Sequence, residues 1–167
     1  MKINSQISND LNITPDAVIP YFCNNNWSLH DLITHCLAFT GKANIKISSF
    51  SISEAALRSF IANKEDDLVH SLTLLFDYTI PKRKFDLFLF AHEVFSEIRL
   101  ATNHSKVILL DGDINKLVVL CSQNLTPNPR LESGVVITKA SLYQFFDTHF
   151  DKYFSEAIPF NPYCDEN

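Results

Sequence analysis

Glycine is scarce in this chain of 167 residues, which has three glycines against fourteen phenylalanines. Such a composition favours a dense core with few flexible loops, and it differs from that of a disordered or low-complexity chain. The N-terminal residues lack the apolar run of a signal peptide, and no apolar stretch is long enough to span a bilayer. The sequence therefore predicts a globular cytoplasmic protein that does not associate with a membrane.

Paired cysteines and an excess of positive charge are also missing. The four cysteines are scattered without C-x-x-C spacing, so neither a zinc site nor a disulfide framework is indicated. The net charge of -5 at pH 7 argues against broad, non-specific coating of DNA, which requires many lysines and arginines. It leaves room for a local basic groove, because net charge does not determine how the charges are distributed.

The apolar pattern divides the chain into three parts. Residues 1–26 are rich in asparagine and are expected to form an N-terminal arm. Residues 27–157 have the regular pattern of a single domain, and residues 158–167 are expected to form a C-terminal tail.

Within the domain, helices and strands alternate at first and then several strands follow in a run. The first helix is expected between a serine cap at Ser28 and a stop at Gly41, and the second follows a capping box at 51–54. The predicted helices cover 29–40, 55–63, 85–95 and 139–157, and the predicted strands cover 43–50, 68–80, 97–102, 105–110, 117–121 and 135–138. This order predicts an α/β fold, a mixed β-sheet flanked by helices on both faces.

The segment from 104 to 132 contains the residues that suggest chemistry. Six polar residues stand there in the spacing H-x-K-x4-D, then S-x-N, then a later acid: His104, Lys106, Asp111, Ser122, Asn124 and Glu132. The first spacing alone would occur by chance in roughly one chain in a hundred of this size. Ser122, Asn124 and Glu132 follow in the expected order, on segments that are predicted as strands and a turn. A chance match of the whole series is therefore improbable.

This series resembles the signature of the phospholipase D superfamily, and the segment NLTPNPRLE is similar to that of its single-motif bacterial nucleases. The resemblance implies that residues 27–157 are a catalytic domain with the fold of a single phospholipase-D-like half. It also implies a metal-independent phosphodiesterase, in which lysines supply the positive charge and no cofactor is needed. Nucleic acid is the expected substrate, DNA more than RNA, with endonuclease cleavage as the reaction.

The residue types suit phosphoryl transfer. Residues i and i+2 of an extended segment point to the same face, so His104 and Lys106 would emerge side by side. A neutral imidazole at His104 can attack phosphorus and form a phosphohistidine. Lys106, Asn124 and Ser122 would donate hydrogen bonds to the phosphate oxygens, which stabilises the charge of the transition state.

A carboxylate on the second ring nitrogen would hold the histidine in one tautomer. The resemblance assigns this role to Glu132, with Asp111 as the alternative. Asp111 lies an odd number of residues from His104, so on a straight strand its side chain would face the other way. Arg130 is a candidate for contact with DNA, and the basic triplet 82–84 either contacts phosphates or forms a solvated loop.

One motif supplies only one histidine, whereas the reaction needs a nucleophile and a general acid. None of the other five histidines has a lysine two residues later. A homodimer that places two motifs across a two-fold axis is therefore expected. One departure from the family is Cys121, which stands where a glycine usually precedes the serine.

Two alternatives from other classes remain open. The chain can be a non-catalytic module that keeps the fold and binds nucleic acid or phosphate. It can also be a lipid phosphodiesterase, although no exposed amphipathic basic helix is evident for a membrane surface.

Overall fold

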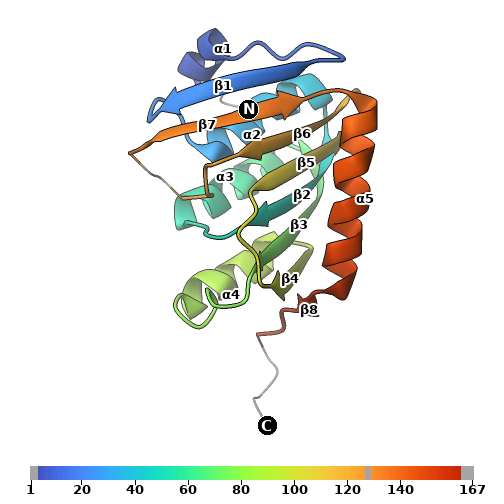
Figure 1. Cartoon of the computed structure of the whole chain (residues 1–167). Coiled ribbons are helices and arrows are strands. Elements are labelled where there is room, and N and C mark those ends of the chain that lie inside the picture. The colour runs from blue at the N-terminus through green and yellow to red at the C-terminus, as the bar shows by residue number, and fades with distance from the viewer. Residues whose placement is uncertain (1–3, 127–128, 163–167) are drawn as a thin grey trace.

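A computed structural model describes residues 4–126 and 129–162, and this part of the chain forms one eight-stranded sheet with five helices (Figure 1). The strands are β1 (Val18–Asn24), β2 (Ala43–Ser49), β3 (Val69–Asp77), β4 (Glu97–Ala101), β5 (Val107–Gly112), β6 (Lys116–Cys121), β7 (Leu131–Ile137) and β8 (Ile158–Pro159). The helices are α1 (Ser5–Asp10), α2 (Leu29–Thr40), α3 (Glu54–Glu65), α4 (Phe85–Val94) and α5 (Ala140–Glu156).

The sheet is mixed, as the sequence predicted. Its strand order is β1-β7-β6-β5-β2-β3-β4-β8. β2, β3 and β4 are parallel neighbours, and the other neighbouring pairs are antiparallel. The parallel strands are connected by α3 and α4, which is the connection that parallel neighbours require.

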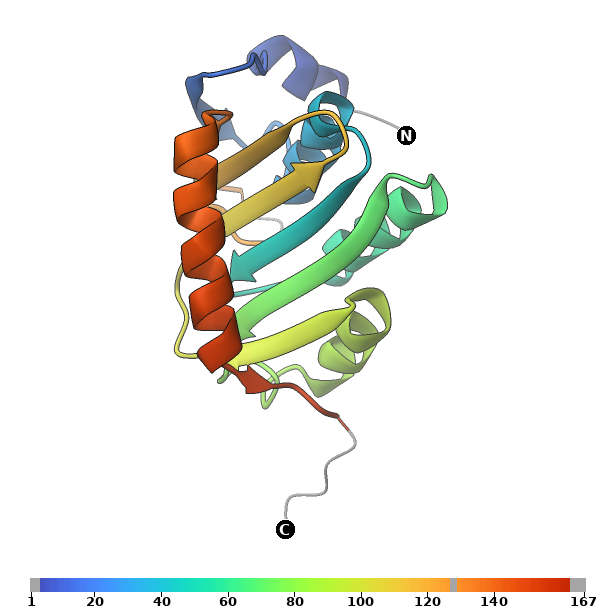
Figure 2. The same ribbon diagram turned by 90° about the vertical axis from the view of Figure 1, so that its right-hand side faces the viewer.

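Helices cover both faces of the sheet, and each face has its own core (Figure 2). Ile108 and Leu110 of β5 pack on the face that carries α1 to α4, whereas Leu109 packs on the face that carries α5. All three are fully buried. A continuous apolar run in place of an alternating one is therefore explained by burial on both sides.

The first predicted helix is confirmed together with its caps. The Ser28 hydroxyl accepts a hydrogen bond from Asp31 N (3.2 Å), and the Asp31 carboxylate accepts one from Ser28 N (2.8 Å). The helix ends before Gly41, whose φ of 73° lies in the left-handed region that favours glycine.

The second predicted cap is wrong by two residues. α3 is capped by Ser53, whose hydroxyl accepts from Ala56 N (3.3 Å). Ser51 lies outside the helix because its carbonyl accepts instead from Leu125 N (3.1 Å). A contact with a segment that is distant in the sequence therefore decides where this helix begins.

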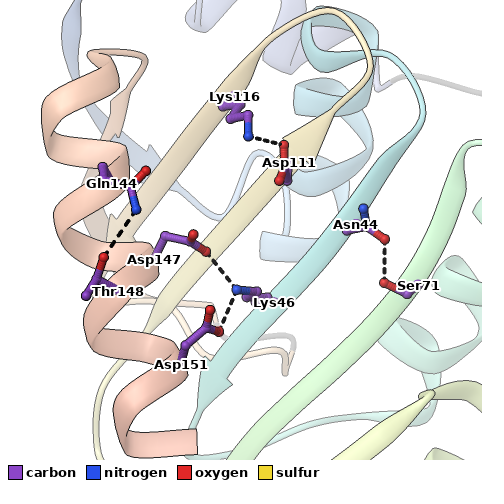
Figure 3. Close-up of polar contacts among 9 residues, drawn as sticks. All are labelled: Asn44, Lys46, Ser71, Asp111, Lys116, Gln144, Asp147, Thr148 and Asp151. Atoms are coloured by element: carbon purple, nitrogen blue, oxygen red, sulfur yellow. Dashed lines mark hydrogen bonds and ion pairs between the residues drawn. The ribbon is translucent and has the colours of Figure 1, made fainter.

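One ion-paired lysine fixes α5 over the sheet (Figure 3). Lys46 of β2 contacts Asp147 (2.8 Å) and Asp151 (2.5 Å) of α5. Partial burial lowers the pKa of the Lys46 ammonium, but the hydrogen bonds and charges of the two carboxylates outweigh this effect, so that its pKa is raised. The lysine is therefore charged at neutral pH and holds the helix.

The predicted N-terminal arm at 1–26 includes a strand of the sheet. β1 pairs with β7 along its whole length, with Tyr21 opposite Gly134. A Cβ on Gly134 would lie 2.6 Å from the Tyr21 hydroxyl, so only glycine allows this close approach. Because residues 18–24 lie in the sheet, this part of the predicted arm is corrected.

The predicted C-terminal tail at 158–167 also contributes to the sheet. Its first two residues form β8, which pairs with β4. Residues 163–167, which include Cys164, lie outside the described residues. The last predicted strand, at 135–138, is longer than expected, because β7 already begins at Leu131. Within 4–126 and 129–162, no helix combines the length and the apolar character needed to cross a membrane.

Candidate active site

Five of the six polar residues of the motif gather at one edge of the sheet. This is the left-hand edge in Figure 1, where β1, β2 and β6 end and where β5 and β7 begin. His104 and Lys106 lie in the loop that precedes β5. Ser122 and Asn124 follow β6, and Glu132 is the second residue of β7. Since β5, β6 and β7 are neighbours, these three segments lie side by side at the edge.

The loop that carries His104 is held by its neighbour Asn103. The buried amide of Asn103 donates to Ser48 Oγ (2.9 Å) and to the Leu75 carbonyl (3.1 Å). The side-chain oxygen Oδ1 of Asn103 accepts a hydrogen bond from Ser105 N (3.0 Å). The backbone is therefore fixed on both sides of His104.

The second anchor of this loop is Asp77, the last residue of β3. Its carboxylate accepts from Asn103 N (3.1 Å) and from Thr79 N (3.0 Å). Burial would raise the pKa of this carboxyl group, but the hydrogen bonds from Thr79 and Asn103 and the charge of Arg83 outweigh it, so that the pKa of Asp77 is lowered. Asp77 is therefore ionised at neutral pH.

Sequence reasoning missed both Asp77 and Asn103. The one available signal was an acid at the end of the apolar run LTLLFD. A buried carboxylate requires partners, and this requirement points to hydrogen-bond donors in a neighbouring loop.

His104 and Lys106 lie side by side, as the sequence predicted, although both precede β5 and do not belong to it. Lys106 Nζ lies 3.5 Å from His104 Nδ1 and donates to the His104 carbonyl (2.9 Å). The imidazole is exposed and packs against the ring of Phe50, with 5.1 Å between the ring centroids. An accessible ring nitrogen and a cation thus face the same space.

Ser122 and Glu132 are joined directly. The Ser122 hydroxyl donates to the Glu132 carboxylate and accepts from Ser133 N (3.0 Å). This bond places Glu132 beside the serine of the motif. The expected role of Glu132 as the partner of the His104 ring stays a prediction.

Asn124 is positioned by the residue that follows it. Leu125 is fully buried, and its backbone forms hydrogen bonds with Ser51 (3.1 Å) and Ser53 (2.9 Å) in the loop before α3. This anchor turns the chain after β6 and brings Asn124 to the edge. Among the described residues, no hydrogen-bond partner meets the buried Oδ1 of Asn124.

The structure does not bring Asp111 to the other five residues. It follows Lys106 by five residues along extended β5, which separates the two residues by roughly 17 Å. Its carboxylate pairs with Lys116 Nζ (2.7 Å) on the side of the sheet where α5 lies (Figure 3). Asp111 is therefore left out of the candidate site.

Exposed cations lie at the same edge as His104. Arg130 is exposed immediately before β7, and residues 82–84 are exposed in the turn after β3. Together with Lys106 they place five cationic side chains at this end of the sheet, where the carboxylates of Asp77 and Glu132 also lie. Among the described residues, no cluster of three or more His, Cys, Asp or Glu side chains is arranged to hold a metal ion.

Cys121 is not a second nucleophile at this edge. Its thiol donates to the Gln123 carbonyl (3.5 Å), and burial raises its pKa to about 12. The thiol is therefore protonated at neutral pH, and the thiol form is a weak nucleophile.

No protein-family model and no curated protein match the sequence. Solved structures do match. The phospholipase D family member Nuc from Salmonella typhimurium is 16% identical, with 87% of this chain and 98% of that chain covered and a TM-score of 0.65. NucT from Helicobacter pylori is 15% identical, with coverages of 86% and 100% and a TM-score of 0.62. TrmBL2, an archaeal chromatin protein, is 16% identical, with coverages of 93% and 58% and a TM-score of 0.59. These similarities show that the chain has the phospholipase D fold, as the resemblance of its sequence predicted.

Proposed function

Starting from this fold, we propose that the chain is a metal-independent phosphodiesterase that cleaves nucleic acid, DNA more than RNA, at a site shared by two copies. The observation that carries the proposal is the convergence of His104, Lys106 and the Ser122–Glu132 pair at one edge of the sheet. A phospholipase D family member among the similar structures supports the reaction. A chromatin protein with a described mode of DNA binding supports the substrate.

The reaction follows from the residue types. A ring nitrogen of His104 attacks phosphorus, and the bond from phosphorus to the leaving oxygen breaks as the phosphohistidine forms. The His104 of the second copy protonates the leaving oxygen. It then takes a proton from a water molecule, whose oxygen attacks phosphorus and breaks the P–N bond. This second step releases the phosphate monoester and restores both histidines.

The remaining site residues stabilise and orient the reacting groups. Lys106 and Asn124 donate hydrogen bonds to the non-bridging oxygens, where negative charge develops. Ser122 joins them when its hydroxyl turns from the Glu132 carboxylate to the phosphate. Glu132 holds the imidazole in the tautomer that leaves one nitrogen free. Arg130 contacts a neighbouring phosphate of the nucleic acid strand.

The homodimer is part of the proposal because one described chain has a single H-x-K pair. Two apolar side chains beside the site support it: Phe22 is 74% exposed and Leu131 is 66% exposed. Phe22 lies opposite Ser133, and Leu131 precedes Glu132. A second copy packed on this surface would bury both side chains and bring a second histidine to the edge.

The test is hydrolysis of bis(p-nitrophenyl) phosphate in EDTA by the wild type and by His104→Ala. We expect turnover by the wild type and its loss in the variant. His70→Ala is the matched control, because His70 lies at the opposite edge of the sheet, at the start of β3. Turnover that depends on added metal, or that survives His104→Ala, would contradict the proposal.

A second candidate function is nucleic-acid binding without cleavage. The presence of this fold in a chromatin protein favours it as the alternative. Saturable DNA binding that survives His104→Ala, with no hydrolysis by the wild type, would select it. Release of head group from phospholipid vesicles, without cleavage of DNA or RNA, would select the lipid phosphodiesterase instead.

A further inference from the structure

A polar cavity of about 240 Å³ lies next to the candidate site and shares two residues with it. Asn124 and Glu132 line one side of the cavity. The other walls come from the loop between β1 and α2, from the chain before α1 and from the segment after β6. Side-chain amides are the commonest polar groups among the described residues of its lining, and they belong to Asn4, Asn25, Asn26, Gln123 and Asn124.

Two residues that line the cavity each carry a buried polar atom without a partner among the described residues. These atoms are the indole Nε1 of Trp27, a donor, and the Oδ1 of Asn124, an acceptor. An unsatisfied buried polar atom costs about 1–3 kcal/mol. The side-chain amides of the lining present both N–H donors and carbonyl acceptors, so the cavity favours a ligand with both kinds of group.

The walls of the cavity are held before any ligand arrives. The ring of Trp27 packs against that of Tyr21, with 5.1 Å between centroids, and the Trp27 carbonyl accepts from Cys23 Sγ (3.1 Å). The Tyr21 hydroxyl donates to Gln123 Oε1 (3.2 Å), which leaves the NH2 group of Gln123 available as a donor. Pre-organised groups of this kind bind a ligand without the cost of being ordered.

The charges of the described residues that line the cavity do not favour a phosphate as its ligand. The described residues that line it include no lysine or arginine, whereas Asp31 and Glu132 are both present. A phosphate belongs instead at Lys106, outside the cavity. A neutral group with several donors and acceptors fits the amides, and the edges of nucleobases are read by Asn and Gln side chains in this way.

The volume points to a small ligand. Pockets for drug-sized molecules measure about 300–1,000 Å³, and this cavity lies below that range. We infer that the cavity binds one nucleobase of the substrate, next to the phosphate that is cleaved. This inference rests on the proposed function in so far as the substrate is a nucleic acid, and it adds a base-recognition site to that function.

The single tryptophan of the chain provides a direct readout, because Trp27 lines the cavity. The experiment titrates the wild type with adenosine, guanosine, cytidine and thymidine, and follows Trp27 emission with excitation at a wavelength that nucleosides do not absorb. Isothermal titration calorimetry on the same samples detects binding that leaves the emission unchanged. We expect saturable binding of at least one nucleoside.

Two leucine variants locate the binding. Asn26 is exposed at the cavity, so Asn26→Leu fills it without disturbing the core, and the Kd is expected to rise at least about tenfold. Asn44→Leu is the matched control, because Asn44 is exposed near the start of β2, at the end of the sheet away from the cavity. Its Kd should equal that of the wild type.

Three results would overturn the inference: no binding of any nucleoside by either method, a Kd that Asn26→Leu leaves unchanged, or equal binding of ribose without a base. Nucleosides contain no phosphodiester, so the result does not depend on catalysis. Hydrolysis of bis(p-nitrophenyl) phosphate without nucleoside binding would overturn the inferred base site and leave the proposed enzyme standing. Nucleoside binding without hydrolysis would contradict the proposed enzyme activity and support the base site.

Discussion

The two ends of β5 carry the two parts of the H-x-K-x4-D pattern and are built differently. At its start, His104 and Lys106 present polar groups at the edge of the sheet. They lie on a loop that is held by hydrogen bonds of the buried Asn103 side chain. At its end, Asp111 pairs with Lys116, and the chain turns into β6. The first end presents an exposed imidazole beside a lysine, whereas the charged groups of the second end pair with each other.

Close packing characterises the second end. A Cβ on Gly112 would lie 2.2 Å from the Thr40 carbonyl, so a side chain there would displace backbone. The turn is closed further by Asp113 N, which donates to the Lys42 carbonyl (2.9 Å). One sequence signature can therefore combine exposed polar residues with residues that hold the strand, and only their positions in the fold separate the two.

The largest effect is expected from Lys106→Met. Removal of a positive charge beside the imidazole should lower turnover of bis(p-nitrophenyl) phosphate about 100- to 1,000-fold. The midpoint of urea unfolding should stay the same, since among the described residues the Nζ of Lys106 forms its hydrogen bonds with His104 of the same loop. Lys116→Met, at the other end of β5, is the matched control and should keep turnover. Equal losses in the two variants would refute the division between the ends.

Asn103→Ala tests the support of the histidine loop. Loss of the buried amide should lower kcat about 10- to 100-fold with little change in KM, because the histidine is misplaced. It should also lower the free energy of unfolding by about 1–3 kcal/mol. Asn115→Ala removes a hydrogen bond to the Phe39 carbonyl (2.9 Å) at the other end and should affect stability alone. An unchanged kcat in Asn103→Ala would exclude a positioning role.

Acid should weaken the same support through Asp77. The folded-state pKa of Asp77 is lowered, so its contribution to stability is present above the pKa of an unfolded carboxyl, about 3.9, and is lost as the pH falls through the folded-state value. The difference in unfolding free energy between the wild type and Asp77→Asn should therefore be constant from about pH 8 to pH 5 and shrink below about pH 4. A difference that grows on acidification would contradict this account.

The smallest effect is expected from Asp111→Asn. The ion pair with Lys116 is exposed to solvent, with 40% of the Asp111 side chain accessible. Such pairs contribute about 0–1 kcal/mol, so urea unfolding should shift by no more than this. Turnover should stay within about twofold of the wild type, because Asp111 does not touch the proposed site. A loss comparable to that of Lys106→Met would place Asp111 among the catalytic residues after all.

Local signals in the sequence predicted much of the fold. The capping pattern at Ser28 and the glycine at Gly41 gave the bounds of α2, because both act through neighbours in the sequence. The mixed sheet and its helices followed from periodicity. β1 was missed, because its partner β7 lies more than a hundred residues away and Asn-rich flanks obscured the buried positions Tyr21 and Cys23.

The site was predictable only in part, for the same reason. The spacing of His104 and Lys106 is local, and their contact follows from it. The hydrogen bonds of Asn103 reach Ser48 and Leu75 across 55 and 28 residues, and no local pattern indicates them. The amide cavity likewise joins segments near residues 4, 26 and 124. Such groupings exist only once the chain has folded.

The most direct test of the shared site is a subunit-mixing experiment. Wild type and His104→Ala, with different affinity tags, are co-refolded in varying ratios, and hydrolysis of bis(p-nitrophenyl) phosphate is measured. If each site needs a histidine from both copies, activity falls with the square of the wild-type fraction, to about one quarter in an equal mixture. A linear fall, to about one half, would show that each chain acts alone and would contradict the central claim.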